Sequence, residues 1–281
     1  MINLASIGVL YSESVLSLYP ILVKQLRSSL TSQVFQRCVA YSVLALLFGG
    51  MGSMINIFSS GANILLFLGL GLVNLAHVST SYRAFQRLPG GAALTLFYTY
   101  PILNILGAWL VFGEKISSSS LPYFALIMGG VYLLITATGK AKDVPGVVKE
   151  AMEDSTDKKS FEWVDVLAGL GAAVTETLIY LLLYSRRAEK GVNMFTSVQR
   201  VYGSSALLML PLLFAGKIDF IGGEVTKMGL WNGLLGFTGY AARFAAIPLV
   251  SPILFSALSL FGIVMGYLWI LWPHNLQPIQ F

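Results

Sequence analysis

Charge is scarce in this sequence. Only 11% of its 281 residues are Asp, Glu, Lys or Arg, whereas soluble domains carry about 25%. A chain with so few charges cannot cover a water-facing surface. Its formal net charge of +5 is also spread too thinly to form the basic face of a nucleic-acid-binding protein. The composition therefore excludes a soluble domain, and we expect no nucleic-acid partner.

Residues that hold metals or perform catalysis are also few. The chain has one cysteine, Cys38, and two histidines, His77 and His274, which excludes a disulfide framework and a thiolate metal site. It contains no Gly-x4-Gly-Lys-Ser/Thr phosphate-binding loop, no His-Glu-x-x-His and no Gly-x-Ser-x-Gly motif. We expect no catalytic residues, no metal and no cofactor, so an intramembrane enzyme is only a minor alternative.

Long apolar segments are what the sequence does contain. Hydrophobic residues make up 56% of the chain, and its mean hydropathy is +0.75. A helical crossing of a bilayer needs about 20 mostly apolar residues, and continuous runs favour helices over the short alternating strands of a membrane barrel. The sequence predicts an all-α, multi-pass integral membrane protein with crossings at 2–22, 34–55, 63–82, 90–112, 119–138, 164–184, 195–215, 228–246 and 249–272.

One polar segment divides the chain almost in half. Residues 140–163 are rich in Lys, Asp and Glu, and we interpret them as a solvated linker, with a short amphipathic helix as the alternative. The linker separates a first unit, 1–139, from a second unit, 164–281. Most loop Lys and Arg residues lie on the side of Lys24 and Arg27, so the positive-inside rule places that side in the cytoplasm.

The two units are similar to each other when the sequence is shifted by 163 residues. Ser12-Glu13-Ser14 then falls on Thr175-Glu176-Thr177, and Gln36-Arg37 falls on Gln199-Arg200. Such residues are scarce inside membranes, so their recurrence at one spacing indicates a duplication. Five crossings per unit, an odd number, would invert the second unit relative to the first, as in many secondary transporters.

The duplication predicts a tenth crossing after Asn275. Only residues 276–281 remain there, too few to span a bilayer. We therefore expect two inverted five-helix repeats with nine helices visible, and a tenth that is either truncated or missing.

This pattern resembles the drug/metabolite transporter superfamily, specifically its EamA-like members. Two segments carry the resemblance: Tyr100-Pro101-Ile102-Leu103 through Phe112-Gly113-Glu114-Lys115, which is similar to the family's proline-containing fourth helix, and Ser251-Pro252-Ile253-Leu254 through Tyr267-Leu268-Trp269, which is similar to its ninth. The second repeat lacks the Gly-Glu ending. The resemblance implies ten helices in two inverted repeats and a cytoplasmic N-terminus. The positive-inside rule places the side of Lys24 and Arg27 in the cytoplasm and the N-terminus, on the other side of the first crossing, outside. The two criteria disagree, so the orientation stays open.

Two glutamates lie near the middle of predicted crossings. Glu13 is in the first and Glu176 in the sixth. A carboxylate in a desolvated place is more easily protonated than in water, so either residue could carry a proton during a transport cycle. The alternative is a structural partner for a nearby cation or hydroxyl group.

Four arginines lie near the ends of predicted crossings. Arg37 and Arg83 are near one membrane face, and their repeat equivalents, Arg200 and Arg243, are near the other. Such pairs would suit the alternate capture of an anionic substrate, because guanidinium forms bidentate bonds with carboxylate or phosphate. For Arg83 and Arg243 we favour contact with lipid headgroups, and for Arg37 and Arg200 a buried role.

Neutral polar residues complete the candidate substrate-binding or coupling site: Gln36, Gln199, His77, Tyr98, Tyr100, Asn104 and Tyr240. The sequence thus predicts a secondary transporter that moves a small polar or anionic organic metabolite by alternating access between the repeats, with coupling to protons or exchange. A non-transporting membrane scaffold or subunit is the alternative. The substrate, the membrane and the oligomeric state stay open at this point.

Overall fold

The computed structural model describes residues 3–26, 28–115, 125, 129, 162–189, 192–219 and 222–271. Every regular element in these ranges is a helix. The first half contains α1 (Leu4–Leu16), α2 (Tyr19–Lys24), α3 (Leu30–Gly49), α4 (Gly52–Phe58), α5 (Gly61–Arg87), α6 (Gly90–Phe97) and α7 (Tyr100–Phe112). The second contains α10 (Trp163–Ser185), α11 (Met194–Val198), η3 (Gln199–Gly203), α12 (Ser204–Phe214), α13 (Gly223–Trp231), η4 (Asn232–Gly236), α14 (Phe237–Ala246), α15 (Pro252–Ser259) and α16 (Phe261–Leu271).

Six helical segments of the described chain are long and apolar enough to cross a membrane: Leu4–Lys24, Leu30–Gly49, Gly61–Arg87, Gly90–Phe112, Trp163–Ser185 and Pro252–Trp269. They match six of the predicted crossings to within a few residues at most ends. The predicted crossings at 195–215 and 228–246 coincide with the helical stretches α11–η3–α12 and α13–η4–α14. The predicted crossing at 119–138, the linker at 140–163 and the segment beyond 271 lie almost entirely outside the described residues.

The second crossing ends earlier than the sequence pattern indicates. We expected it to continue to residue 55, but α3 ends at Gly49 and a short separate helix, α4, follows. Gly50 has a φ of 65°, a left-handed conformation that glycine adopts without steric cost. This conformation terminates the helix, because the backbone cannot continue an α-helical path through it.

Two crossings are broken in the middle, and both breaks precede a Tyr-Pro dipeptide. The first crossing is interrupted at Ser17 and Leu18, before Tyr19-Pro20, and the fourth at Tyr98 and Thr99, before Tyr100-Pro101. Proline suits the first turn of a helix, because it has no backbone N–H to leave unpaired there. It therefore starts α2 and α7 as new helices, and the tyrosines at the breaks point into the bundle, where they are buried.

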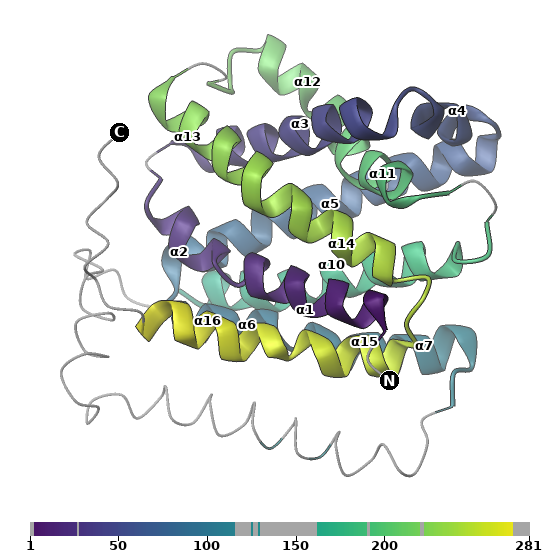
Figure 1. Ribbon diagram of the computed structural model, residues 1–281. Coiled ribbons are helices and arrows are strands. Elements are labelled where there is room, and N and C mark those ends of the chain that lie inside the picture. The colour runs from purple at the N-terminus through teal and green to yellow at the C-terminus, as the bar shows by residue number, and fades with distance from the viewer. Residues whose placement is uncertain are drawn as a thin grey trace.

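Helices from the two halves pack against each other. The long helix α5 lies against α10, and α1 lies against α14; in Figure 1, α1, α14 and the α15–α16 pair cross the front of the bundle with α5 and α10 behind them. The middle of α3 contacts η3. Every side chain of the sites described below lies on one of these contacting elements or beside a break.

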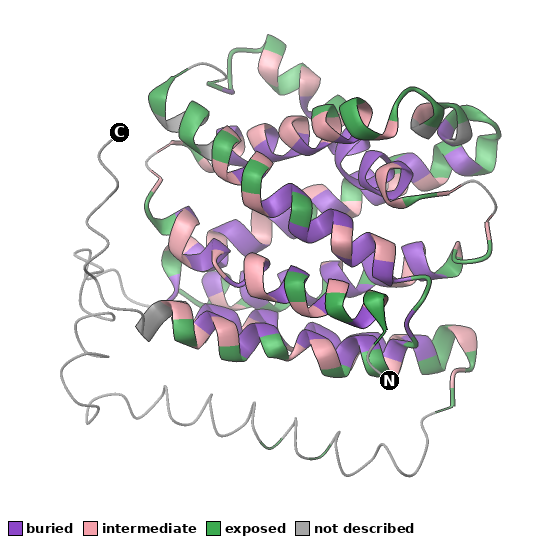
Figure 2. Ribbon diagram, viewed as in Figure 1, coloured by how far each residue is buried: buried purple, intermediate pink, exposed green. Residues whose placement is uncertain are grey.

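The distribution of polarity is the reverse of that in a soluble protein. Large apolar side chains lie on the outside, such as Phe214 at 83% exposure and Leu47 at 72%. Charged side chains lie inside, such as Arg200 at 0% and Glu13 at 0%. Figure 2 shows exposed residues along the outer faces of the helices and buried residues along the inner faces. This arrangement is typical of a helical bundle whose surroundings are lipid.

Candidate substrate and coupling site

An ion triad links three helices in the interior. It consists of Glu13 on α1, Glu176 on α10 and Arg243 on α14. Arg243 Nη2 lies 3.3 Å from Glu13 Oε1 and 3.2 Å from Glu176 Oε1. The three side chains are at most 3% exposed. Two tyrosines at the α6–α7 break complete the site, since the hydroxyl groups of Tyr98 and Tyr100 each donate a 3.0 Å hydrogen bond to Glu13.

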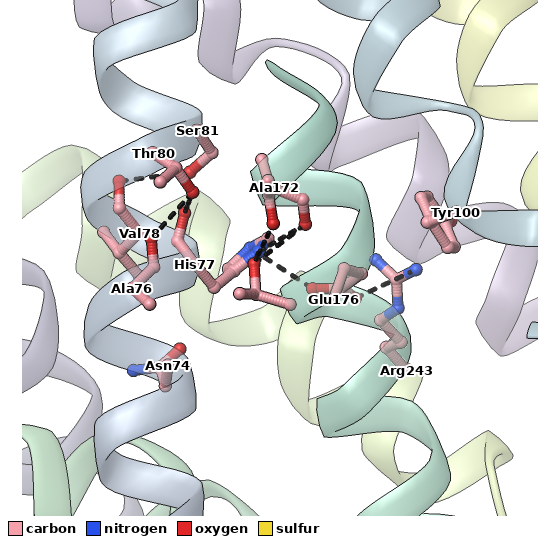
Figure 3. Close-up of polar contacts among 12 residues, drawn as sticks. Asn74, Ala76, His77, Val78, Thr80, Ser81, Tyr100, Ala172, Glu176 and Arg243 are labelled. Carbon is pink, nitrogen blue, oxygen red and sulfur yellow. Dashed lines mark hydrogen bonds and ion pairs between the residues drawn. The ribbon is translucent and has the colours of Figure 1, made fainter. Parts of the chain in front are cut away.

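His77 extends the triad to α5. Its Nε2 lies 3.2 Å from Glu176 Oε2, and its Nδ1 lies 3.1 Å from the carbonyl oxygen of Ala172. Figure 3 shows this line of groups, with the His77 ring pointing from α5 towards α10, and Glu176 facing Arg243 beyond it. A chain of close contacts between ionisable groups therefore runs from α5 through α10 and α14 to α1.

A second cluster surrounds Arg37 on α3, and we call it the Arg37 cage. The guanidinium carbon lies 4.8–5.5 Å from the ring centroids of five tyrosines: Tyr19, Tyr41, Tyr82, Tyr202 and Tyr240. Arg37 Nη2 donates a 3.0 Å hydrogen bond to Tyr202 Oη. Arginine over aromatic faces is a favourable cation–π arrangement, worth about 0.5–2 kcal/mol per ring according to solvation. The cage therefore holds the cation in place without an anion.

The Arg37 cage contains polar atoms whose hydrogen-bonding capacity is unused. Tyr19 Oη donates to Asn232 Oδ1 at 2.7 Å and pairs with Tyr41 Oη at 2.6 Å. Arg37 Nε, Asn232 Nδ2 and Tyr82 Oη are buried and have no partner among the described residues. Two of these groups can only donate a hydrogen bond. The unused capacity of the cage is thus suited to a ligand with acceptor atoms.

The triad and the cage adjoin each other through a shared ring. Tyr240 on α14 lies against the guanidinium carbon of Arg37 at 4.8 Å and that of Arg243 at 6.0 Å. The structure therefore brings together six of the predicted site residues in one polar interior: Glu13, Arg37, His77, Tyr100, Glu176 and Arg243. Tyr98 and Tyr240, predicted as neutral polar groups of the site, lie there as well.

Arg243 does not have the position that we favoured from the sequence. Our prediction placed it at the lipid headgroups, which is wrong, because its side chain is 2% exposed and bonded to two carboxylates. Arg83 is 42% exposed, and its Nε lies 2.9 Å from Asp165 Oδ1. These two arginines therefore have different surroundings, one in the interior and one partly accessible at the N-terminal end of α10.

Arg200 is buried, as we expected, but it lies outside the shared interior described above. Its Nη1 and Nη2 donate hydrogen bonds of 3.2 and 2.8 Å to the two carboxylate oxygens of Glu189. The hydrogen bonds from Arg200 hold the pKa of Glu189 below its usual range. Because this arginine already has an anionic partner, it does not have the unpaired character of Arg37.

The remaining predicted residues have packing roles or unused polar atoms. Gln199 Nε2 donates to the carbonyl oxygen of Ser42 at 2.5 Å, and its Oε1 accepts a 2.9 Å bond from the Ser42 hydroxyl. Gln36 lies close to Gly229, and its Oε1 has no partner in the described part of the chain. Asn104 is fully buried on α7, and neither of its side-chain polar atoms is bonded to a described residue.

Sequence reasoning missed four of the five cage tyrosines. Tyr41 is four residues after Arg37, a spacing that brings two side chains together on one helical face. Tyr19 begins the helix after a break, beside Pro20. These two could have been found from local signals. Tyr82 and Tyr202 lie on α5 and η3, and only the packing of those elements against α3 brings them to the cation.

Comparisons with known proteins agree with this architecture. Residues 3–136 match the EamA-like transporter family. Over these residues the chain is similar to that family. The match and the six long apolar helices of the described residues agree with a multi-pass integral membrane protein. In its described part, no group of three or more His, Cys, Asp or Glu side chains could hold a metal ion.

One solved structure supports the same fold. The crystal structure of another protein is similar to this chain, with a TM-score of 0.59 and 16% sequence identity. The likeness covers 94% of this chain and 86% of that chain. No curated protein sequence matches. At this level of identity the likeness shows the fold alone, so the chemistry of the site has to be argued from its own residues.

Proposed function

We propose that this protein is a secondary transporter of a small anionic organic metabolite and that Arg37 binds the anion. The observation that carries the proposal is a cation, 3% exposed, held by tyrosine rings. In the described ranges no carboxylate lies within ion-pair distance of it. A buried guanidinium without a direct anionic partner is costly in a membrane protein interior. An anionic ligand would offset that cost.

The unused donors of the Arg37 cage favour the same class of substrate. Arg37 Nε and Asn232 Nδ2 offer hydrogens, whereas carboxylate and phosphate oxygens only accept. Guanidinium can also bind such groups through two parallel bonds. A cationic ligand would be repelled, and a neutral ligand would leave the Arg37 guanidinium without an anionic partner. The cage chemistry therefore favours a carboxylate, phosphate or sulfonate group.

We further infer that transport proceeds by alternating access between two inverted repeats. The 163-residue shift relates α1 to α10, and the 160-residue shift that aligns Arg83 with Arg243 relates α5 to α14. If so, the contact of α1 with α14 and the contact of α10 with α5 are equivalent contacts between the two repeats. This equivalence supports a pseudo-twofold axis between the repeats. The position of Glu13 and Glu176 beside the same arginine, Arg243, supports it as well.

The broken helices support a transport role for the same region. Secondary transporters commonly build their sites from discontinuous helices near the membrane midplane. Here the α1–α2 break positions Tyr19 beside Arg37, and the α6–α7 break positions Tyr98 and Tyr100 beside Glu13. A rocking of one repeat against the other around these residues would expose the cage to each side in turn.

Ligand binding by purified protein tests the substrate class. We would measure thermal stability with inorganic phosphate, methanesulfonate or succinate, and with choline and mannitol as cationic and neutral references. We expect stabilisation by at least one of the anions only. Arg37→Gln should weaken the apparent affinity for that anion about 10-fold or more, because a charged hydrogen-bonding partner is lost. Arg187→Gln, at an arginine 39% exposed, is the matched control and should bind as wild type.

Uptake into proteoliposomes tests transport itself. The labelled anion that stabilises the protein should enter vesicles containing wild type and Arg187→Gln, and enter those containing Arg37→Gln much more slowly. Stabilisation by choline or mannitol alone, or an unchanged anion response in Arg37→Gln, would overturn the assignment of the site. Binding of an anion without any uptake would contradict transport and favour a membrane scaffold or subunit.

A further inference from the structure

The pair formed by His77 and Glu176 has one proton fewer than its geometry needs. His77 Nδ1 faces the carbonyl oxygen of Ala172 at 3.1 Å. A carbonyl oxygen only accepts, so Nδ1 must carry the hydrogen. In a neutral imidazole the other nitrogen, Nε2, then has a bare lone pair. That lone pair faces Glu176 Oε2 at 3.2 Å.

Two acceptors at this distance oppose each other unless a proton lies between them. The second neighbour of Nδ1 does not change the assignment, because the hydroxyl of Thr175 lies 3.5 Å away and already donates to Gly171. Glu176 Oε2 is buried and receives no hydrogen bond from any described residue. One added proton converts this contact into an ion pair between an imidazolium and a carboxylate, with Nε2 and Oε2 3.2 Å apart.

The surrounding charges set what else must bind with that proton. The ionisable groups that face His77 and Glu176 from the packed elements are Glu13 of α1, Arg37 of α3, Arg243 of α14, and the tyrosines Tyr100, Tyr202 and Tyr240. The two arginines balance the two glutamates while His77 is neutral. A proton therefore gives this interior an excess of one positive charge.

We propose that the His77–Glu176 pair is a proton-binding site that takes up one proton together with one monovalent anion bound at Arg37. The proposal rests on the anion site proposed above. The proton turns the His77–Glu176 contact into an ion pair, and the anion restores electroneutrality, so each favours the binding of the other in a poorly solvated interior. Transport would then be electroneutral symport of a proton and a monovalent organic anion.

The proton balance of such a cycle is simple. The proton enters from water on the side of higher proton concentration and binds to Nε2 of His77, which becomes an imidazolium ion paired with the carboxylate of Glu176. It leaves to water on the other side after the anion has departed from Arg37. No bond other than N–H forms or breaks, and no redox partner takes part.

The protonation of His77 can be measured without knowing the substrate. The chain has two histidines, so a His274→Gln background leaves His77 as the single imidazole for ¹⁵N nuclear magnetic resonance in lipid nanodiscs. We expect Nδ1 to carry a proton throughout a titration from alkaline to acidic pH, and Nε2 to gain one as the pH falls. In a Glu176→Gln variant of this background, the signal of the protonated Nε2 should be lost at pH values where the parent shows it.

The outcomes separate this proposal from the proposed function. A bare Nε2 over the whole titration, or an unchanged titration in Glu176→Gln, would overturn the proton site even if Arg37 binds anions. If Arg37 binds no anion, the proposed function fails whatever the state of His77. If Glu176→Gln does not fold, the wild-type titration still decides.

Uptake completes the test of the proton site. Inward proton gradients should accelerate uptake of methanesulfonate or another monovalent anion that the protein binds, and His77→Asn should abolish this acceleration. Acceleration by a sodium gradient alone would contradict the proposal.

Discussion

Replacement of Arg243 by glutamine is the perturbation whose effect on stability follows most directly from the structure. Arg243→Gln keeps a polar side chain but removes the only Arg or Lys within ion-pair distance of Glu13 and Glu176 in the described chain. Both carboxylates then remain buried without a counter-ion. Breaking a buried ion pair by removing one partner costs about 3–5 kcal/mol. We expect a loss of at least this size here, because one arginine serves two acids.

Arg83→Gln is the matched control for this measurement. Like Arg243, it pairs with an acid, because its Nε lies 2.9 Å from Asp165 Oδ1. Its side chain is 42% exposed, so water and headgroups can replace the lost contact, and exposed pairs contribute only about 0–1 kcal/mol. Reversible unfolding of both variants in mixed micelles gives the free energies of unfolding for comparison.

A second replacement tests the cause of the loss. Glu13→Gln in the Arg243→Gln background removes one of the two unpaired carboxylates, so the double variant should be more stable than Arg243→Gln alone. Such non-additivity is expected only for residues in direct interaction. The reasoning is refuted if Arg243→Gln lowers the free energy of unfolding no more than Arg83→Gln does. It is also refuted if the effects of Arg243→Gln and Glu13→Gln on the free energy of unfolding are simply additive.

Three further predictions concern the remaining elements of the interior. Glu189→Gln should cost about 3 kcal/mol, because it leaves the buried guanidinium of Arg200 without its anionic partner. The pKa of Glu189 is lowered in the folded protein, so the pair stabilises above the ordinary glutamate pKa; acid should destabilise wild type more than this variant in unfolding assays. Gly236→Ala places a methyl group where two cage hydroxyl groups lie and should weaken anion binding in the thermal-shift assay, whereas Gly69→Ala meets no neighbouring atom and should leave binding unchanged. Arg37→Lys keeps the charge but not the bidentate fork and should bind anions with an affinity between those of wild type and Arg37→Gln.

The hydropathy of the sequence predicted much of the fold. The long apolar runs located the six candidate crossings. The thickness of the bilayer sets the length of a crossing, and an apolar run of that length can be recognised in a single sequence. The repeated hydroxyl–Glu–hydroxyl triplet singled out Glu13 and Glu176, which share Arg243 in the structure. The end of α3 at Gly49 was missed, because the apolar run continues beyond a glycine whose φ is 65°.

The surroundings of the arginines were harder to predict. Arg83 and Arg243 both lie near helix ends, and only the packing of α14 against α1 makes one of them interior. The five rings around Arg37 come from α2, α3, α5, η3 and α14. Tyrosine is common in membrane proteins, so no local signal distinguishes these rings. Their convergence is a property of tertiary structure.

The most direct test of the whole account is uptake of a labelled organic anion by purified protein in liposomes, compared between wild type and Arg37→Gln. We predict saturable uptake by wild type that excess unlabelled anion inhibits, and a loss of about 10-fold or more in apparent affinity when the guanidinium is removed. Equal uptake by the two proteins, with both correctly folded, would contradict the assignment of the buried Arg37 as the anion-binding group.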